Sequence, residues 1–599
     1  MSDIKQPPKR SEISTEDTWD LTILFENEQA WEDTFTQWCG KIDGFVEFEG
    51  KLHQVDQLLA LLEYEEEFQK KSEMLGQYAS LKKEEDGSNQ DSQDRWERYL
   101  GAASLAGQAI CFVPPELLSL PEEELTTLII DPKLERYSLW LERLARRKPH
   151  TLSNEEELIL AMQYEVSLGC DSVFGQLSNV DMRFPTVENE KGEKIELSNS
   201  SYAELLQSPK QEVRADAFTK FYKTYESLQH TFAATLSGAY KRDIFEARVR
   251  KYTSSLDAAL FPDNIPADVY DGLILSVREH LPLLHKYYDV RRRALGLEEI
   301  HQYDTYVPIL PDMKKSHTWD QATSVILDSL APLGDEYVEN MRNGFNSRWC
   351  DKYENRGKCS GAFCSGIFSC HPFVLMNFKE DVLEDVFTLS HEMGHAMHSF
   401  YSSKNQPFPK YDYVIFCAEV ASTFNEQLLA RYLMDRATDK KERAYLLCRQ
   451  IDAVRNTIIR QTMFAEFEKL IHEDAEHGNA MTLEKFRGAY RELLDAYFGE
   501  NFVIDDLLEC ECFRIPHFYR AFYVYKYATG LSAAIALANK VLDGGDTERE
   551  AYLRFLASGC EKDPLDLLKD AGVDLTTQGP VDSALSSFGK MVDELDGLV

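Results

Sequence analysis

Apolar residues recur three and four positions apart through most of this chain, and this helical period constrains the fold more than any other feature of the sequence. Residues 51–81 are an example, because they read KLHQVDQLLALLEYEEEFQKKSEMLGQYASL. Helical patterns also occupy residues 28–106, 154–168, 202–250 and 268–295. With 599 residues, the chain is too long for a single hydrophobic core. We therefore expect a mainly α-helical protein with two or more packed parts.

Two short segments interrupt the helical pattern. Residues 183–198, RFPTVENEKGEKIELS, form two alternating runs around Lys191-Gly192, which predicts a β-hairpin. Residues 357–377, GKCSGAFCSGIFSCHPFVLMN, are rich in glycine, serine and aromatic residues and indicate a second strand-containing patch. We place a domain boundary near residue 195. It separates an N-terminal helical region, residues 1–195, from a large and mainly helical remainder, residues 196–599.

Charge and composition exclude several classes of function. The formal net charge is −37, so the surface repels phosphate backbones, and we expect no nucleic-acid partner. No run of about 18 apolar residues occurs, so we expect no membrane-spanning helix. The polar N-terminus has no apolar segment typical of a signal peptide. The twelve cysteines are scattered without the spacing of a zinc site, which favours free thiols in the reducing cytoplasm.

The segment 385–401, DVFTLSHEMGHAMHSFY, contains the strongest functional motif. His391 and His395 lie one helical turn apart, so both imidazoles can hold one zinc ion from a rigid helix. Glu392 is displaced around the helix and can act on water without being a ligand, which is the chemistry of His-Glu-x-x-His. Gly394 costs about 1 kcal/mol relative to alanine inside a helix, so we expect a packing reason for it. An apolar stripe marks the opposite face: Val386, Leu389, Met393, Met397 and Phe400.

A zinc site of this type needs a third protein ligand. Glu419 is the candidate, because it lies on a second predicted helix, CAEVASTFNEQLLARYLMD, about 24 residues after His395. Glu426, two turns further on, could accept the free N–H of a ligand histidine and fix its tautomer. Asp385 could do the same, although it could equally be an ordinary acid at a helix start.

Five segments together resemble the thimet oligopeptidase/oligoendopeptidase F family of zinc peptidases, with the greatest similarity to oligoendopeptidase F. They are WDLTILFENEQAW (19–31), YTSSLDAALFPDNIP (252–266), GKCSGAFCSG (357–366), HEMGHAMHS followed by AEVASTFNE, and IPHFYRAFYVYKYATG (515–530). The resemblance spans nearly the whole chain. It implies a mainly helical ellipsoid with a deep channel, a zinc ion at the channel floor, small β-elements near the active site, and cytoplasmic endopeptidase activity on oligopeptides.

The resemblance also implies roles for individual residues. The zinc ligands fall on His391, His395 and Glu419, the general base on Glu392, and a supporting acid on Glu426. The strand that pairs with the substrate backbone by strand addition falls on the segment that contains Gly361, Ala362 and Phe363.

A histidine and a tyrosine near the C-terminus hydrogen-bond the tetrahedral intermediate in this family. The histidine falls on His517, which follows Pro516 at a predicted helix start. Tyr519, Tyr523 and Tyr527 then recur every four residues, on one face of the predicted helix, and such spacing alone would favour core packing. With the resemblance, we favour Tyr523 as the second donor, then Tyr527, which we also assign to substrate binding; Tyr519 and Tyr525 stay open.

The sequence therefore predicts a zinc-dependent endopeptidase with one zinc ion per chain and short, unstructured oligopeptides as substrates. A zinc carboxypeptidase with the same metal core is one alternative. A non-catalytic peptide-binding scaffold is another, although structural zinc sites usually fill all four positions with protein ligands. Side-chain preference and oligomeric state are left open by the sequence.

Overall fold

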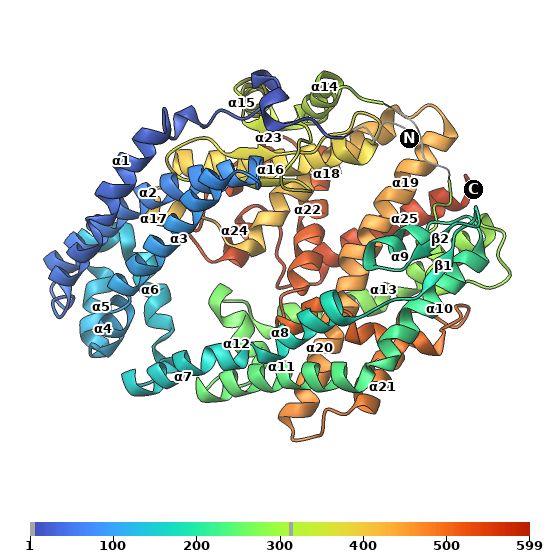
Figure 1. Ribbon diagram of the computed structural model, residues 1–599, viewed down its shortest axis with the longest axis horizontal. Coiled ribbons are helices and arrows are strands. Elements are labelled where there is room, and N and C mark those ends of the chain that lie inside the picture. The colour runs from blue at the N-terminus through green and yellow to red at the C-terminus, as the bar shows by residue number, and fades with distance from the viewer. Residues whose placement is uncertain (1–5, 311–315) are drawn as a thin grey trace. The chain divides into compact units, whose positions relative to one another are not determined.

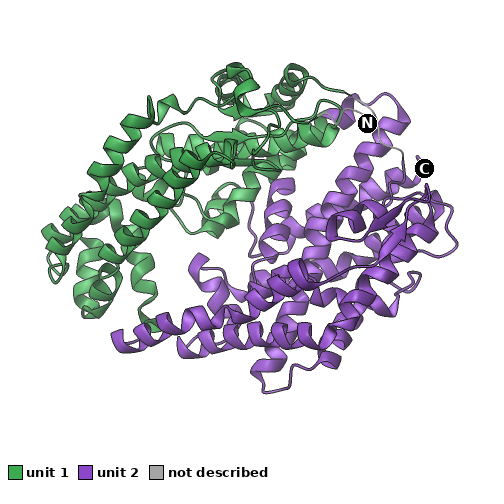
Figure 2. Ribbon diagram, in the orientation of Figure 1, with its two compact units in different colours: residues 1–151, 314–432, 537–572 green, residues 152–313, 433–536, 573–599 purple. Residues whose placement is uncertain are grey.

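The computed structural model describes residues 6–310 and 316–599, and Figure 1 shows helices in nearly every part of it. The predicted mainly α-helical fold is confirmed, because the strands of the described residues form only two small sheets. Figure 2 distinguishes two compact units. Unit 1 comprises residues 1–151, 314–432 and 537–572, and unit 2 comprises residues 152–313, 433–536 and 573–599.

Both units are discontinuous in sequence. The predicted domain boundary near residue 195 lies within unit 2. The division of the sequence into residues 1–195 and 196–599 stays a prediction. The ellipsoidal shape and the channel implied by the resemblance also stay predictions.

Unit 1 is built mainly from helices, with one three-stranded sheet. Its regular elements are α1 (Glu28–Cys39), α2 (Val55–Glu85), α3 (Gln90–Ile110), α4 (Val113–Ser119), α5 (Glu122–Ile130), α6 (Ser138–Arg146), α14 (Trp319–Ser329), α15 (Asp335–Asn346), β3 (Cys350–Asp351), β4 (Phe363–Ser365), β5 (Phe373–Leu375), α16 (Leu383–Asn405), α17 (Phe408–Tyr411), the greater part of α18 (Ile415–Arg436), α23 (Asp546–Ala557) and α24 (Pro564–Asp570).

Two tryptophans join α1 to α2 in the core of unit 1. Trp31 and Trp38 are fully buried, and the ring of Trp38 stacks on Phe68 at a centroid distance of 4.8 Å. The indole N–H of Trp31 donates to the carbonyl oxygen of Leu75 at 3.0 Å, and that of Trp38 donates to the carbonyl oxygen of Phe68 at 3.2 Å. Large aromatic surfaces are thus buried without leaving their polar atoms unpaired.

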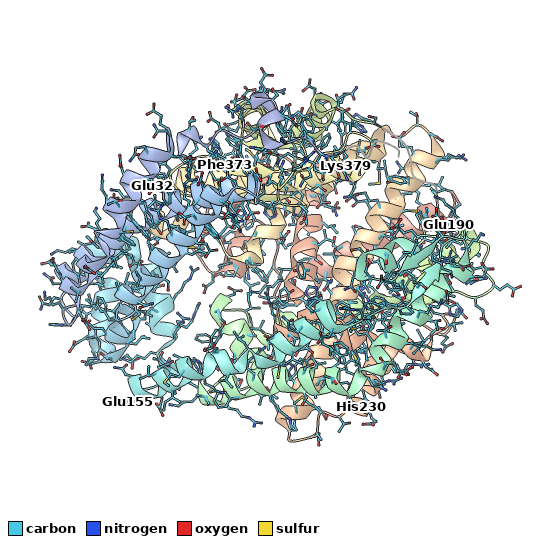
Figure 3. All side chains as sticks on the ribbon, viewed as in Figure 1. Glu32, Glu155, Glu190, His230, Phe373 and Lys379 are labelled. Atoms are coloured by element: carbon cyan, nitrogen blue, oxygen red, sulfur yellow. The ribbon has the colours of Figure 1, made fainter. Side chains whose placement is uncertain are left out.

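The sheet of unit 1 has the strand order β3-β5-β4, with β5 parallel to β3 and antiparallel to β4. Phe373, Val374 and Leu375 of the central strand are completely buried, as expected for a continuous apolar run covered on both faces. Figure 3 labels two residues of this region. Phe373 on β5 is buried, whereas Lys379, four residues after β5 ends, is exposed to solvent. The predicted strand-containing patch is therefore confirmed.

Unit 2 is also helical and contains the second sheet. Its regular elements are α7 (Asn154–Ser167), α8 (Gly169–Gln176), β1 (Thr186–Glu188), β2 (Lys194–Glu196), α9 (Asn199–Leu205), α10 (Gln211–Ser227), α11 (Gln229–Val249), α12 (Ser255–Leu260), α13 (Ala267–Ala294), α19 (Lys440–Val454), α20 (Arg460–Glu476), α21 (Leu483–Phe498), the 3₁₀ helix η13 (Pro516–Tyr519), the first part of α22 (Tyr525–Asp543) and α25 (Gly579–Asp596).

The predicted hairpin is confirmed, because β1 and β2 pair antiparallel with Val187 opposite Ile195. Its turn is closed by Asn189, whose Oδ1 accepts the N–H groups of Lys191 and Glu193 at 3.0 and 2.9 Å. Gly192 has a φ of +80°, a left-handed conformation that glycine adopts without strain.

Within the described residues, no single helix is long and apolar enough to cross a membrane; one bent pair, Gln90–Ser119 with Glu122–Ile130, passes the same test only when its two parts are counted together. The twelve cysteines all lie in the described part of the chain, and none of them is in a disulfide.

Candidate metal centre

Helix α16 carries the His-Glu-x-x-His motif. Val386, Leu389, Met393 and Met397 are buried along one side, so the predicted apolar stripe anchors this helix in unit 1. His391 and His395 face the other way, are half-buried, and have ring centroids 4.9 Å apart. Acidic residues in the first turn, Glu384 and Asp385, suit the positive end of the helix dipole.

Helix α18 brings the third candidate ligand to the two histidines. The carboxylate Oε2 of Glu419 lies 3.5 Å from Nε2 of His391 and 3.8 Å from Nε2 of His395. The helices approach closely at Gly394, where a Cβ atom would lie only 2.7 Å from the Cα of Ser422 and 2.8 Å from the carbonyl oxygen of Ala421. The packing reason expected for Gly394 is this backbone-to-backbone contact.

The three side chains fit one small cation. One ligand atom from each of His391, His395 and Glu419 lies within 4.8 Å of the others. Tetrahedral zinc with bonds of about 2.0–2.1 Å needs ligand atoms about 3.4 Å apart, close to the measured 3.5 and 3.8 Å. Nδ1 of His391 is 2.8 Å from Oε1 of Glu426, so a proton on Nδ1 leaves the Nε2 lone pair free for a metal.

Burial favours the neutral ring of His395, which is the form that binds a metal. Burial, with a further contribution from His391, lowers the pKa of His395 to about 3, so its ring is neutral at pH 7. Burial by itself would lower the pKa of His391, but its hydrogen bond to Glu426 and the nearby carboxylates raise it. At pH 7 a metal therefore competes with a proton for the ring of His391 more than for the ring of His395.

Glu392 is almost entirely buried, with 8% of its surface exposed. Burial raises the pKa of its carboxyl to about 7; Glu419 and Glu426 act in the same direction, while His391 opposes the shift. The backbone N–H of Cys364 on β4 faces this carboxylate and stabilises its charged form. A buried carboxylate with such a pKa can both accept and return a proton near neutral pH.

The segment expected to bind the substrate backbone lies at a sheet edge beside α16. Gly361 and Ala362 precede β4, and Phe363 is its first residue. Among residues 6–310 and 316–599, β5 is the only strand that pairs with β4, so the other edge of β4 carries no partner strand. An unpaired edge is the feature that strand addition requires.

The second predicted supporting acid, Asp385, makes a different contact from the one expected. Its Oδ2 accepts the backbone N–H of Lys379 at 2.7 Å, so it fixes the chain that enters α16. The helix direction explains the difference, because Asp385 lies nearly two turns before His391, whereas Glu426 approaches that ring from α18.

The predicted C-terminal donors lie in unit 2. The Tyr523 hydroxyl hydrogen-bonds Nδ1 of His517, and the ring of Tyr527 lies 5.7 Å from that of Tyr523 and 6.3 Å from His517. These three side chains therefore form one cluster. The metal ligands and Glu392 belong to unit 1.

The single helix predicted from Pro516 through Tyr527 is wrong. Instead, η13 ends at Tyr519, and α22 begins only at Tyr525. Phe522 between them has a φ of +54°, a left-handed conformation that breaks the helix. Tyr519 is consequently separate from the cluster: its hydroxyl hydrogen-bonds Thr235 at 2.7 Å, and its ring stacks on another aromatic residue of unit 2.

One contact of the centre was missed at the level of sequence, namely the N–H of Cys364 beside Glu392. The two residues are 28 positions apart and on different elements, and backbone groups leave no signal in a side-chain pattern.

Two family models match the chain. "Peptidase family M3" matches residues 204–587, and "Oligopeptidase F" matches residues 116–184. Among curated proteins, Oligopeptidase PepF of Bacillus subtilis is 40% identical over 596 residues, 99% of this chain and 89% of that protein. Group B oligopeptidase PepB of Streptococcus agalactiae is 38% identical over 592 residues, which cover 98% of each chain.

Solved structures show the same similarity. A Chlamydophila abortus protein, solved as a candidate peptidase, superposes with a TM-score of 0.95 at 36% identity and covers 99% of this chain and all of its own. Oligoendopeptidase-F from Enterococcus faecium superposes with a TM-score of 0.74 at 33% identity, over 95% of this chain and 99% of that chain.

Proposed function

This chain belongs to peptidase family M3 and is a metalloendopeptidase, and from that premise we propose that it uses a zinc ion to hydrolyse internal bonds of short, unstructured peptides. The observation that carries the proposal is the convergence of His391, His395 and Glu419 beside the buried carboxylate of Glu392. Nitrogen and oxygen ligands at these separations suit zinc, and three protein ligands leave one position for the reaction.

We assign one zinc ion per chain to Nε2 of His391, Nε2 of His395 and the carboxylate of Glu419. Bound there, zinc would supply a Lewis acid that polarises a peptide carbonyl and makes water acidic. Glu426 holds the ring of His391 in the orientation that a metal ligand needs, since their 2.8 Å contact fixes the proton on Nδ1.

Glu392 is the proposed general base and acid. Its carboxylate takes a proton from the attacking water and then gives it to the leaving amine, which completes peptide hydrolysis without a covalent intermediate. The backbone N–H of Cys364 favours the charged form of this carboxylate, which is the form that accepts the proton.

The remaining roles concern the substrate. We propose that the free edge of β4, with Gly361, Ala362 and Phe363, pairs with the peptide backbone. His517 and Tyr523 would donate hydrogen bonds to the oxyanion of the tetrahedral intermediate, each worth about 3–4 kcal/mol in comparable sites. Tyr527, beside both, would contact the bound peptide.

We also propose a cytoplasmic location and oligopeptides as the physiological partners. None of the twelve cysteines is in a disulfide, which supports a reducing compartment, where disulfides are rare.

A peptide blocked at both ends, with a fluorophore and quencher on opposite sides of the internal bonds, tests the proposal. A carboxypeptidase needs a free C-terminal carboxylate, so only an endopeptidase can cleave this substrate. We expect cleavage that stops on chelation and returns with zinc. Cleavage confined to unblocked peptides would favour the carboxypeptidase, and zinc binding without any cleavage would favour the scaffold.

A further inference from the structure

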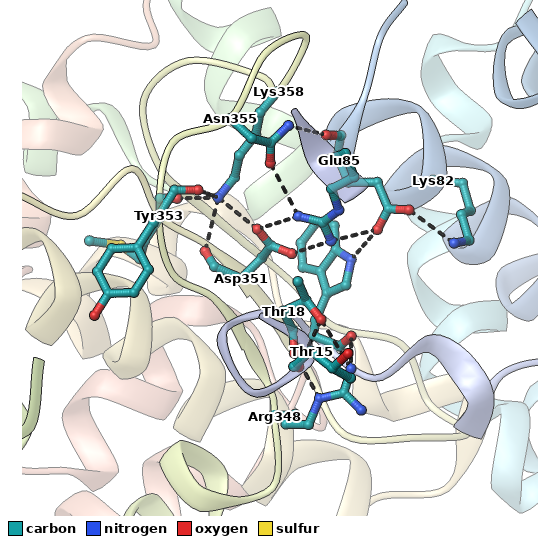
Figure 4. A network of polar contacts seen from close by, with 12 residues as sticks. Thr15, Thr18, Lys82, Glu85, Arg348, Asp351, Tyr353, Asn355 and Lys358 are labelled. Atoms are coloured by element: carbon teal, nitrogen blue, oxygen red, sulfur yellow. Dashed lines mark hydrogen bonds and ion pairs between the residues drawn. The ribbon is translucent and has the colours of Figure 1, made fainter. Parts of the chain in front are cut away.

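A buried polar cluster lies in unit 1 beside the sheet that contains β4 (Figure 4). At its centre, the carboxylate of Asp351 and the ammonium group of Lys358 are both completely excluded from solvent, 2.7 Å apart. Asp351 is the last residue of β3, and Lys358 lies in the loop that leads to β4. Burying two charges is costly, so such a pair is retained only where other contacts complete it.

Lys358 joins three parts of the sheet region. Its ammonium group donates to the carbonyl oxygens of Asp351 at 3.2 Å, Tyr353 at 2.6 Å and Met376 at 2.5 Å. These acceptors lie at the end of β3, in the loop after it, and just beyond β5. The Lys358 side chain therefore links the loop that follows β3 to both β3 and β5.

The other partner of Asp351 comes from the far N-terminus. The guanidinium of Arg10 forms a two-pronged pair with the Asp351 carboxylate, at 2.9 and 2.5 Å, and also contacts Oε2 of Glu85 at 2.9 Å. The same Glu85 oxygen accepts the indole N–H of Trp19 at 2.9 Å. Arginine suits this position, because its rigid fork matches a carboxylate in a way that lysine cannot.

Backbone contacts fasten the rest of this N-terminal segment along the same region. The N–H of Lys352 donates to the carbonyl of Asp17 at 2.9 Å, and the N–H of Asp20 donates to the carbonyl of Arg348 at 3.0 Å. Residues 9–20 therefore lie along the strand and loop that hold Asp351; we call them the N-terminal strap.

The pairing of the strands connects these contacts of Arg10, Asp351 and Lys358 to the candidate metal centre. β3 pairs with β5 and β5 pairs with β4, and Cys364 of β4 lines one cavity with His395 of α16. The loop before β4 is fixed as well, because Asn377 donates from its amide to the carbonyls of Cys359 and Gly361 at 2.9 and 2.8 Å.

We propose that the N-terminal strap, through Arg10 on Asp351 and with Lys358 as the internal cross-link, positions β4 for catalysis. Displacing β4 changes both its peptide-binding edge and the wall of the cavity that it shares with His395. Arg10, Asp351 and Lys358 are positioning residues: they act through β4 and touch neither the substrate nor the metal. The inference rests on the proposed function of β4 and Glu392.

The test compares Arg10→Met, Arg10→Lys and a control, Arg98→Met. Arg98 forms an equally two-pronged pair with Glu32, at 2.9 and 2.7 Å, also in unit 1 but on the surface between α3 and α1. Zinc content, thermal midpoint, kcat and KM on the doubly blocked peptide are measured for each zinc-loaded variant. Hydrogen exchange of residues 359–366 reports directly on β4 and its loop.

We expect Arg10→Met to keep one zinc per chain, to raise KM and to lower kcat, with kcat/KM falling about tenfold or more, since small misplacements of reacting groups have such effects. Exchange at residues 359–366 should become faster. Arg10→Lys should recover part of both losses, and Arg98→Met should behave as wild type.

If Arg10 has a purely structural role, Arg10→Met will have a lower thermal midpoint, but its kcat, its KM and the hydrogen exchange of residues 359–366 will be unchanged well below that midpoint. This result would overturn the inference. If Arg10→Met does not fold, the same comparison is made with Glu85→Gln, which weakens the hold on Arg10 from α2 and should give a smaller change of the same kind. Failure of the proposed function is distinguishable, because wild-type protein would then not cleave the blocked peptide at all.

Discussion

Replacing Gly394 with alanine should push apart the two helices that carry the candidate metal ligands. A Cβ atom at this position would lie 2.7 Å from the Cα of Ser422, whereas ordinary contacts begin at 3.4 Å. The obstacle is backbone of α18, which cannot rotate away as a side chain can. The helices must therefore separate by about 0.7 Å, the difference between the two distances.

This displacement exceeds what a metal site tolerates. Ligand distances in a working site fall within about 0.2 Å of their ideal values. Overpacking of this kind costs about 1–3 kcal/mol, which corresponds to a factor of about 5 to 150 in affinity when the strain opposes binding. Because His391 and His395 are on α16 and Glu419 is on α18, the zinc Kd of Gly394→Ala should rise about 5- to 150-fold.

Competition with a chromophoric chelator measures the Kd. Gly107→Ala is the matched control, since Gly107 lies on α3 in the same unit with open space where its Cβ would be. The control should bind zinc normally and gain up to about 1 kcal/mol of stability from helix propensity. Wild-type zinc affinity in Gly394→Ala would refute the idea that this close approach sets the ligand geometry.

Four further results are expected. Glu426→Ala should raise the zinc Kd about 10- to 100-fold by isothermal titration, because His391 loses its orienting partner; an unchanged Kd would remove that role. Tyr523→Phe should lower kcat about 100-fold or more with little change in thermal midpoint, and near-normal turnover would exclude it as an oxyanion donor. Tyr519→Phe should do the reverse, losing about 1 kcal/mol of stability with its hydroxyl hydrogen bond and keeping kcat; a kinetic defect would contradict its structural role. In chelator-treated protein, burial raises the pKa of Glu392 from an ordinary 4.5 to about 7, so its ionisation destabilises the folded state by up to about 3 kcal/mol as pH rises from 4.5 to 7. Glu392→Gln does not ionise, so the difference between its thermal midpoint and that of wild type should increase between pH 5 and pH 8. A constant difference would contradict the burial argument.

The helix that carries His391 and His395 could be predicted because its signal is local. The spacing of Val386, Leu389, Met393 and Met397 determines the buried face of α16, and that face in turn directs His391 and His395 away from the core. Sequence also indicated that Gly394 had a packing role, but its contact with α18 is a tertiary feature that periodicity does not contain.

The break after η13 shows why the C-terminal segment could not be predicted in the same way. Phe522 adopts its left-handed conformation against residues fifty or more positions earlier. Its N–H donates to Oε1 of Glu468 at 3.4 Å, and its ring lies 4.5 Å from that of His472. Local spacing favoured one continuous helix, and long-range contacts prevailed over it. The break separates Tyr519 from Tyr523, so it changes which tyrosine lies beside His517.

The contact between Arg10 and Asp351 is the extreme case, because the partners are 341 positions apart in the sequence. Each residue alone reads as an ordinary surface charge, and only the folded chain shows that Asp351 is completely buried. The discontinuous units have the same origin, because segments distant in sequence pack together in each of them.

In the proposed mechanism, Glu392 performs the proton transfers while His391, His395 and Glu419 hold the zinc. The most direct test is the turnover of the doubly blocked peptide by zinc-loaded Glu392→Gln, which keeps the shape of the side chain and removes the base. We expect one zinc per chain, retained peptide binding, and a kcat at least about 100-fold below wild type. Wild-type turnover with zinc bound would contradict it.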